Sequence, residues 1–416
     1  MLNRVTRLVS LVCLAVGPCG ILSAADHEKA DFSRLVIVGD SLGAGYQNSQ
    51  LIETGQVHGY ANVIATQADV SLKQPLLPPP GYPQITIVQG FAVVTGINPV
   101  SRLNTQQTFD IAVPGFTVGA LVGLHPSCTP NLANPIEVMA AEILNPRCST
   151  NPGPTELQLA ASLKPTTAIL WVGSNDVLLS LLLGTAPTDI GTFSFLYHVA
   201  ATTMANASGH LVLANVPDVT LTAYLTSVPK LAVILNLPVP IVEAVFHLQP
   251  DDMVTPYAFA AIEAMGTKLT ALPDSGQQGP IVLRAATLSL IRAHVLAYNA
   301  IIASEAAANG ATLVDIWSLV NSLAAKGVEV GGQRLTTDFR GGLFSLDGVH
   351  PTNTGNAIIA NEFIKTMNRS IQAGIPPISV EQVSNTDPLI PDDNHEEQSG
   401  HVSVGMADGL RALGRR

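Results

Sequence analysis

The 416-residue sequence has few charged residues, and basic residues are the scarcer kind. Only 12% of its residues are charged, with 20 Lys and Arg against 31 Asp and Glu, and it has no basic run. A protein that follows the phosphates of a nucleic acid needs clustered positive charge. Nucleic acid is therefore not an expected partner, whereas a hydrophobic content of 47% indicates a folded chain with a large core.

Aromatic residues and cysteines are also scarce. Aromatics make up 5% of the chain and include two Trp, which is few for a cleft that stacks sugar rings. Two of the four cysteines, Cys13 and Cys19, lie near the N-terminus, which leaves Cys128 and Cys148 in a Pro- and Asn-rich stretch. No His or second Cys pair at ligand spacing accompanies them, so a metal site is disfavoured. We expect a disulfide that closes this loop in an oxidising compartment, with two free thiols as the alternative.

The first 25 residues have the layout of a secretory signal. Arg4 and Arg7 precede an apolar stretch that ends in small residues near Ala25. This order predicts export and cleavage after Ala25, hence a secreted, periplasmic or outer-envelope protein. The alternative is a membrane anchor, but the stretch is short and is interrupted by two glycines and a proline.

Five short apolar runs recur along the chain, each followed by a polar turn. Continuous Val, Ile and Leu without alternation predict strands covered on both faces, as in a parallel sheet with helices on either side. We therefore predict a doubly wound α/β fold of about five strands. The runs are RLVIVGDS (34–41), FDIAVPG (109–115), TAILWVGSND (167–176), HLVLANVPD (210–218) and ATLVDIW (311–317).

Insertions and a tail complete the predicted main domain, residues 26–375. Residues 84–96 resemble a hairpin, and an apolar insertion covers about 219–280. Pro238 and Pro240 interrupt the longest apolar run of this insertion, so it should not span a bilayer. Residues 376–416 begin as an acidic, Pro-containing sequence, and we expect a mobile tail there.

The predicted strands end in polar clusters. Ser41 follows the first, Gly115 the second and Asn175 the third, and the DGVHP stretch (347–351) follows the fifth. Ligands bind at this edge of an open parallel sheet. GDSLG also fits the G-x-S-x-G nucleophile elbow, with a plain strand-to-helix corner as the alternative. A phosphate-binding loop is excluded because no Lys follows.

A serine hydroxyl needs an adjacent base, and the base needs a group that fixes its tautomer. His350 has Asp347 three residues before it, and Pro351 biases it towards an extended loop conformation. The tetrahedral intermediate of acyl transfer also needs hydrogen-bond donors. The Ser41 N–H, the Gly115 N–H and the Asn175 amide could supply them, although glycine and asparagine are also ordinary turn residues.

Together these blocks resemble the GDSL hydrolases, the SGNH superfamily of esterases and lipases. The match rests on GDSLGAG (39–45), the glycine of IAVPG, GSND (173–176) and SLDGVHPTNTG (345–355). The resemblance implies a three-layer, flavodoxin-like α/β/α sandwich with neither metal nor organic cofactor. It implies Ser41 as nucleophile, His350 as base, Asp347 as its orienting acid, and Gly115 with Asn175 in the oxyanion hole. In α/β-hydrolases the serine follows a mid-chain strand and the acid lies far from the histidine, so that fold is set aside.

Two apolar runs bear on the substrate. If VLLSLLLG (177–184) and LAVILNLPVPIVEAVF (231–246) line the mouth of the site, they would bind an acyl chain at roughly 0.8 kcal/mol per methylene. The alternative is that both pack on the core. We predict a serine hydrolase of lipid or medium-chain acyl esters, with transient contact to a lipid surface. The alternatives are an acetyl esterase acting on polysaccharide and a non-catalytic binding or adhesion module.

Overall fold

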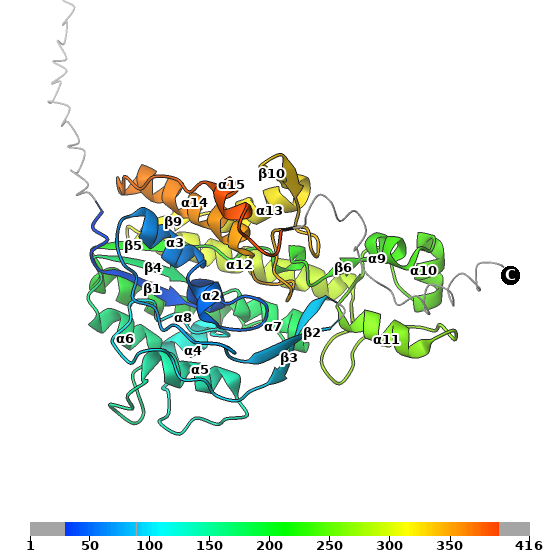
Figure 1. The fold of residues 1–416 in the computed structure, drawn as a ribbon, viewed down its shortest axis with the longest axis horizontal. Coiled ribbons are helices and arrows are strands. Elements are labelled where there is room, and N and C mark those ends of the chain that lie inside the picture. The colour runs from blue at the N-terminus through cyan, green and yellow to red at the C-terminus, as the bar shows by residue number, and fades with distance from the viewer. Residues whose placement is uncertain (1–29, 89, 391–416) are drawn as a thin grey trace, which may run out of the picture.

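The computed structural model describes residues 30–88 and 90–390. The predicted signal segment and residues 391–416 lie outside the described residues. Four strands form a parallel sheet in the order β1 (Leu35–Gly39), β4 (Thr167–Trp171), β5 (His210–Ala214) and β9 (Thr312–Val314) (Figure 1). The predicted doubly wound sheet is confirmed, and its continuous apolar runs are buried on both faces because helices cover them.

The second predicted strand, within 109–115, is an edge segment that does not form a full ladder. Residues 109–113 lie parallel to β1, with Ile37 N–H donating to Phe109 O at 2.8 Å and Val113 N–H donating to Gly39 O at 3.1 Å. The Asp110 side chain accepts the Ala112 N–H, a local bond that competes with strand pairing. The described sheet therefore has four strands instead of about five, although the segment occupies the predicted place beside β1.

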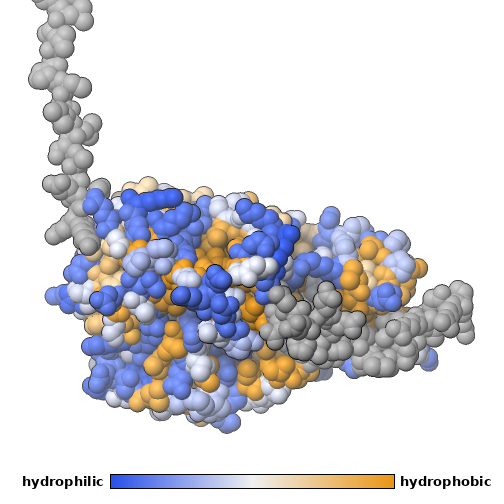
Figure 2. Space-filling model, turned by 45° about the horizontal axis from the view of Figure 1, so that its top comes forward, coloured by the Kyte–Doolittle hydropathy of each residue, from blue (hydrophilic) through white to orange (hydrophobic). Residues whose placement is uncertain are grey.

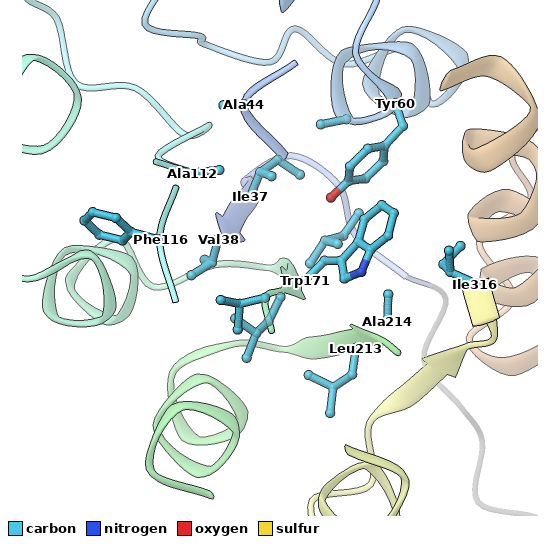
Figure 3. Packing of buried hydrophobic residues seen from close by; sticks show 14 of the residues in the cluster. Ile37, Val38, Ala44, Tyr60, Ala112, Phe116, Trp171, Leu213, Ala214 and Ile316 are labelled. Carbon is cyan, nitrogen blue, oxygen red and sulfur yellow. The ribbon is translucent and has the colours of Figure 1, made fainter. Parts of the chain in front are cut away.

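Helices cover both faces of the sheet (Figure 1). On one face, Tyr60 of α3 (Tyr60–Gln67) and Phe363 of α14 (Asn353–Ser370) stack at 4.9 Å over Trp171 (Figure 3). On the other, Phe193 of α8 (Ile190–Ala207) stacks on Tyr298 of α12 (Ala285–Ala308) at 3.8 Å. These aromatic contacts fix the three layers at the strand ends that carry the site.

Helix α12 is long and apolar enough by length and composition to cross a membrane. Its buried residues nevertheless recur every three or four positions and belong to the main core, as expected of a helix with one face on a sheet. They are Leu288, Ile291, Val295, Tyr298, Ile302 and Ala306.

The remaining main-domain elements are short and lie mostly in the connections. The short strands β10 and β11 form an antiparallel pair, as do β2 and β3, which confirms the predicted hairpin. These elements are α1 (Ser41–Ala44), α2 (Glu53–Gln56), β2 (Gln84–Val88), β3 (Phe91–Gly96), α4 (Val118–Gly123), α5 (Pro135–Leu144), α6 (Glu156–Ser162), α7 (Asn175–Leu183), the 3₁₀ helix η1 (Val219–Leu221), α13 (Ile316–Lys326), β10 (Val328–Val330) and β11 (Gln333–Leu335).

The apolar insertion forms a small unit with a hydrophobic cluster of its own at one end of the molecule (Figure 1). Its helices α9 (Val228–Leu235) and α10 (Val239–Phe246) meet at 102°, as the interrupting prolines predict. Hydrophobic residues also reach its surface, and Val233 is 80% exposed (Figure 2). The unit is completed by β6 (Thr226–Ser227), β7 (Met253–Val254), α11 (Tyr257–Met265) and β8 (Val282–Leu283).

The expected mobile tail is wrong for residues 376–390. This segment contains α15 (Val380–Ser384), and Ile378 exchanges two hydrogen bonds of 2.8 and 3.0 Å with the Asn361 side chain on α14. The Asp387 carboxylate accepts the Thr354 N–H and hydroxyl, both at 2.8 Å. The acidic composition did not predict these contacts, because a hydrogen bond to a side chain distant in the sequence leaves no local sequence pattern.

Candidate active site

Ser41 stands at the carboxyl end of β1 because of the residues before it. Gly39 has φ +149°, and a Cβ there would lie 2.0 Å from the Trp171 carbonyl oxygen, so no other residue fits. Asp40 then caps α1 by accepting the Leu42 N–H at 3.0 Å. The strand therefore turns sharply and leaves Ser41 as the first residue of a short helix.

A chain of two hydrogen bonds joins Ser41, His350 and Asp347. The Ser41 hydroxyl lies 2.8 Å from His350 Nε2, and His350 Nδ1 lies 2.9 Å from Asp347 Oδ2. When Nδ1 donates its proton to the carboxylate, Nε2 is left as the acceptor of the serine proton. Residues 309 positions apart in the sequence thus meet in the arrangement that nucleophilic catalysis by serine requires.

The Asp347 carboxylate is kept ionised by the groups around it. Burial would raise its pKa, but the adjacent His350 and the backbone N–H donors of Ser49 and His350 lower the pKa to about 2. The Ser49 N–H lies 2.7 Å from Oδ2, and the N–H groups of Val349 and His350 each lie 2.8 Å from Oδ1. A fixed negative charge therefore faces Nδ1.

Sequence reasoning missed the loop that holds this pair in place. Asn48 and Ser49 adopt positive φ angles of 53° and 59°, and the Asn48 side chain accepts the Leu346 N–H at 2.8 Å. The Tyr46 ring packs 4.8 Å from the His350 ring. The only local sequence signal for this loop is the Asn48–Ser49 pair, whose residue types favour a tight turn.

Two of the three predicted oxyanion donors, Ser41 and Asn175, line the pocket. Asn175 lies in the same pocket as Ser41 and His350, and its Nδ2 donates one hydrogen bond to Phe116 O at 2.9 Å, which leaves a second N–H. Gly115, with φ +83°, does not line the pocket but follows the edge segment bonded to β1. Among the described residues, the Ser41 and Gly115 N–H groups have no hydrogen-bond acceptor.

Three buried carboxyl groups, those of Asp40, Asp110 and Glu156, lie around the turn that carries Ser41. Glu156 accepts the Gly39 N–H at 2.6 Å, while Asp110 accepts bonds from Gln74 and Ala112. Burial raises the pKa of Asp40 and of Asp110 to about 7, and that of Glu156 well above its usual range. Burial therefore favours the neutral form of these acids, which limits the buried charge behind the β1 turn.

Apart from its few polar groups, the pocket lining is mostly apolar. Of the two runs expected to line it, 177–184 contributes Leu178, and 231–246 contributes nothing. The expectation that the insertion forms this wall is therefore wrong beyond its first residues. The apolar wall consists of Leu42, Trp171, Leu178, Pro217, Val219, Ile316, Val320, Leu323, Leu343, Phe344, Val349, Pro351 and Ile359.

The expected disulfide between Cys128 and Cys148 is present, with Cα atoms 5.3 Å apart, and neither cysteine lines the pocket. Within the described part of the chain, no group of three or more His, Cys, Asp or Glu side chains could hold a metal ion.

The order of these blocks along the chain matches a known family. The family model described as GDSL-like Lipase/Acylhydrolase matches residues 35–363, a span that includes every proposed catalytic and oxyanion-hole residue. The chain belongs to this family. Membership supports carboxylic ester hydrolysis as the activity of this GDSL-like protein.

Several solved structures share low similarity with the chain, whereas no curated protein matches it. LAE5, an α/β hydrolase enzyme from the metagenome of Lake Arreo, is 13% identical, with 82% of this chain and 96% of that one covered at a TM-score of 0.36. Axe2, an acetylxylan esterase from Geobacillus stearothermophilus, is 12% identical with the same coverage and TM-score. A putative GDSL-like lipase from Parabacteroides merdae is 11% identical. The alignment covers 84% of this chain and 100% of that one, with a TM-score of 0.37. At these values the similarities say nothing about substrate.

Proposed function

We propose that this protein is a serine hydrolase that cleaves carboxylic esters through an acyl-enzyme intermediate. The observation that carries the proposal is the hydrogen-bonded chain from Ser41 Oγ through His350 to Asp347, at 2.8 and 2.9 Å. A non-catalytic binding module would need no such chain.

In the first step Ser41 Oγ attacks the ester carbonyl carbon while its proton passes to His350 Nε2. The resulting oxyanion accepts hydrogen bonds from the Ser41 and Gly115 N–H groups and the Asn175 amide. The tetrahedral intermediate collapses, and the alkoxide leaves with the proton from His350. Water then attacks the acyl-enzyme by the same route, which releases the acid and restores Ser41.

The apolar wall supports an acyl chain as the larger part of the substrate. Burying an alkyl chain against such a wall is favourable by about 0.8 kcal/mol per methylene. We therefore infer that the substrates are lipid or medium-chain acyl esters. The Cys128–Cys148 disulfide is consistent with the predicted export to an oxidising compartment.

Labelling with a fluorophosphonate probe tests the proposed nucleophile. The probe should modify the wild-type protein covalently, and Ser41→Ala should abolish the labelling. Ser174→Ala is the matched control, because Ser174 lines the same pocket but its hydroxyl has no hydrogen-bond partner among the described residues. Equal labelling of Ser41→Ala and wild type would refute the mechanism.

A hydrolysis profile tests the proposed substrate class. We expect turnover of esters with medium acyl chains to exceed that of acetyl esters, including acetylated xylan. The reverse ranking would favour the acetyl esterase alternative while leaving the serine mechanism intact.

A further inference from the structure

The pocket beside Ser41 extends away from the sheet along one face of α13. Ile316, Val320 and Leu323 of α13 line it at spacings of four and three residues, so they share one helix face. This row is apolar throughout.

The two ends of this row belong to different clusters. Ile316 is buried in the main core, close to the sheet end formed by Trp171 (Figure 3). Leu323, two turns later, packs against the small cluster of Val330, Leu335 and Leu343. The pocket therefore begins at the strand ends and reaches a separate apolar cluster beyond them.

We propose that the Ile316–Val320–Leu323 face of α13 binds the acyl chain of the ester and that Leu323 limits its length. This inference rests on the proposed function and deepens it. Seven residues of helix separate Ile316 from Leu323, which corresponds to about 10 Å. Carbon–carbon bonds of about 1.5 Å advance an extended chain by about 1.3 Å each, so this face accommodates about eight carbons.

The proposal predicts a specific dependence on acyl length. Each methylene buried against the face should raise kcat/KM about fourfold. The rise should stop at about eight carbons, where the chain meets Leu323. A pocket without a length limit would instead give a continuing rise or no dependence.

The test measures kcat/KM of the full-length protein on p-nitrophenyl esters from acetyl to dodecanoyl. Leu323→Trp should move the plateau to shorter chains and lower octanoyl turnover at least tenfold while acetyl turnover stays within about twofold. Leu323→Ala should move the plateau to longer chains. Ala325→Trp, at an exposed position of the same helix, is the matched control and should leave the profile unchanged.

Unchanged profiles in both Leu323 variants would overturn the proposal, as would an equal loss on acetyl and octanoyl esters in the Leu323→Ala variant. Should Leu323→Trp fail to fold, the Leu323→Ala profile decides alone. Failure of the length limit is distinguishable from failure of the proposed function, because fluorophosphonate labelling of Ser41 and acetyl hydrolysis persist in the first case and are absent in the second.

Discussion

Different forces position the two sets of residues that line the pocket, the polar residues around Ser41 and the apolar row on α13. On the polar side, hydrogen bonds of 2.8 and 2.9 Å connect Ser41, His350 and Asp347, and a separate bond of 2.9 Å from Asn175 to the Phe116 carbonyl orients the amide. On the apolar side, the side chains of the row on α13 offer only apolar contacts, which have no direction. Changes on the polar side should therefore alter the rate for every ester alike, whereas changes on the apolar side should alter the ranking of esters.

The largest expected effect is on the polar side. His350→Ala should lower kcat by about 10⁴-fold or more on every acyl length, because triad members act as a unit. The double variant with Ser41→Ala should have a kcat only slightly lower than that of His350→Ala alone. Steady-state kinetics across acyl lengths check this, with exposed His58→Ala as the control. A loss confined to long-chain esters would break the distinction between the two sides.

A smaller effect is expected for the oxyanion donor. Asn175→Ala should lower kcat by about 10²- to 10³-fold with little change in KM, since the amide bonds the developing oxyanion rather than the bound ester. The Phe116 carbonyl also loses its donor, so thermal unfolding should be measured in parallel. Near-native kcat in a folded variant would remove Asn175 from the oxyanion hole.

The carboxyl groups behind Ser41 should affect stability more than chemistry. Glu156→Ala leaves the buried Gly39 N–H without an acceptor and should destabilise the fold by about 1–3 kcal/mol. Glu156→Gln keeps an acceptor oxygen and is neutral like the protonated acid, so we expect near-native kcat. Urea unfolding and kinetics compare the two variants. Equal loss of kcat in both would mean that an ionised Glu156 is required.

The pH dependence of stability should be the most gradual effect. Burial raises the pKa of Asp40 and Asp110 in the folded state from 3.8 to about 7. The native state then binds more protons than the unfolded state between about pH 4 and 7, so these groups make stability fall as pH rises through that window. Asp347, with its pKa lowered to about 2, contributes stability above about pH 4 that is lost on acidification.

Replacing one carboxyl group of the pair tests this sign. Asp110→Asn should flatten the decrease in unfolding free energy between about pH 4 and 7, by up to about 1.4 kcal/mol per pH unit. Denaturant titrations at several pH values measure it. A steeper decrease in the variant would contradict raised pKa values in this cluster.

Much of the catalytic side could be predicted from the sequence, because its signals are local. GDSLG forms the turn after β1, and Asp347 lies only three residues before His350. Both patterns can therefore be recognised in the sequence without knowledge of the fold. The parallel sheet then brings the strand ends to one edge. The loop at Asn48 and Ser49 could not be predicted, because its partners lie about 300 residues away.

The apolar side was harder to predict, and the strongest apolar runs were misleading. Residues 231–246 belong to a separate small unit and do not line the pocket, whereas three residues of α13 do. Two further predictions also failed because they depended on distant contacts: the full strand predicted at 109–113 and the mobile tail predicted to include 376–390. In each case the outcome depends on which distant surface is available.

The sequence by itself determined the strands, the order of the catalytic blocks and the residue types at the reacting centre, because strand burial, tight turns and acid–base pairs are encoded within a few residues. Only the tertiary structure decided which apolar side chains face the substrate, since hydrophobic burial is non-directional and any buried partner satisfies it. It also decided the protonation of the carboxyl groups behind Ser41, because burial sets their pKa values and burial exists only in the folded chain.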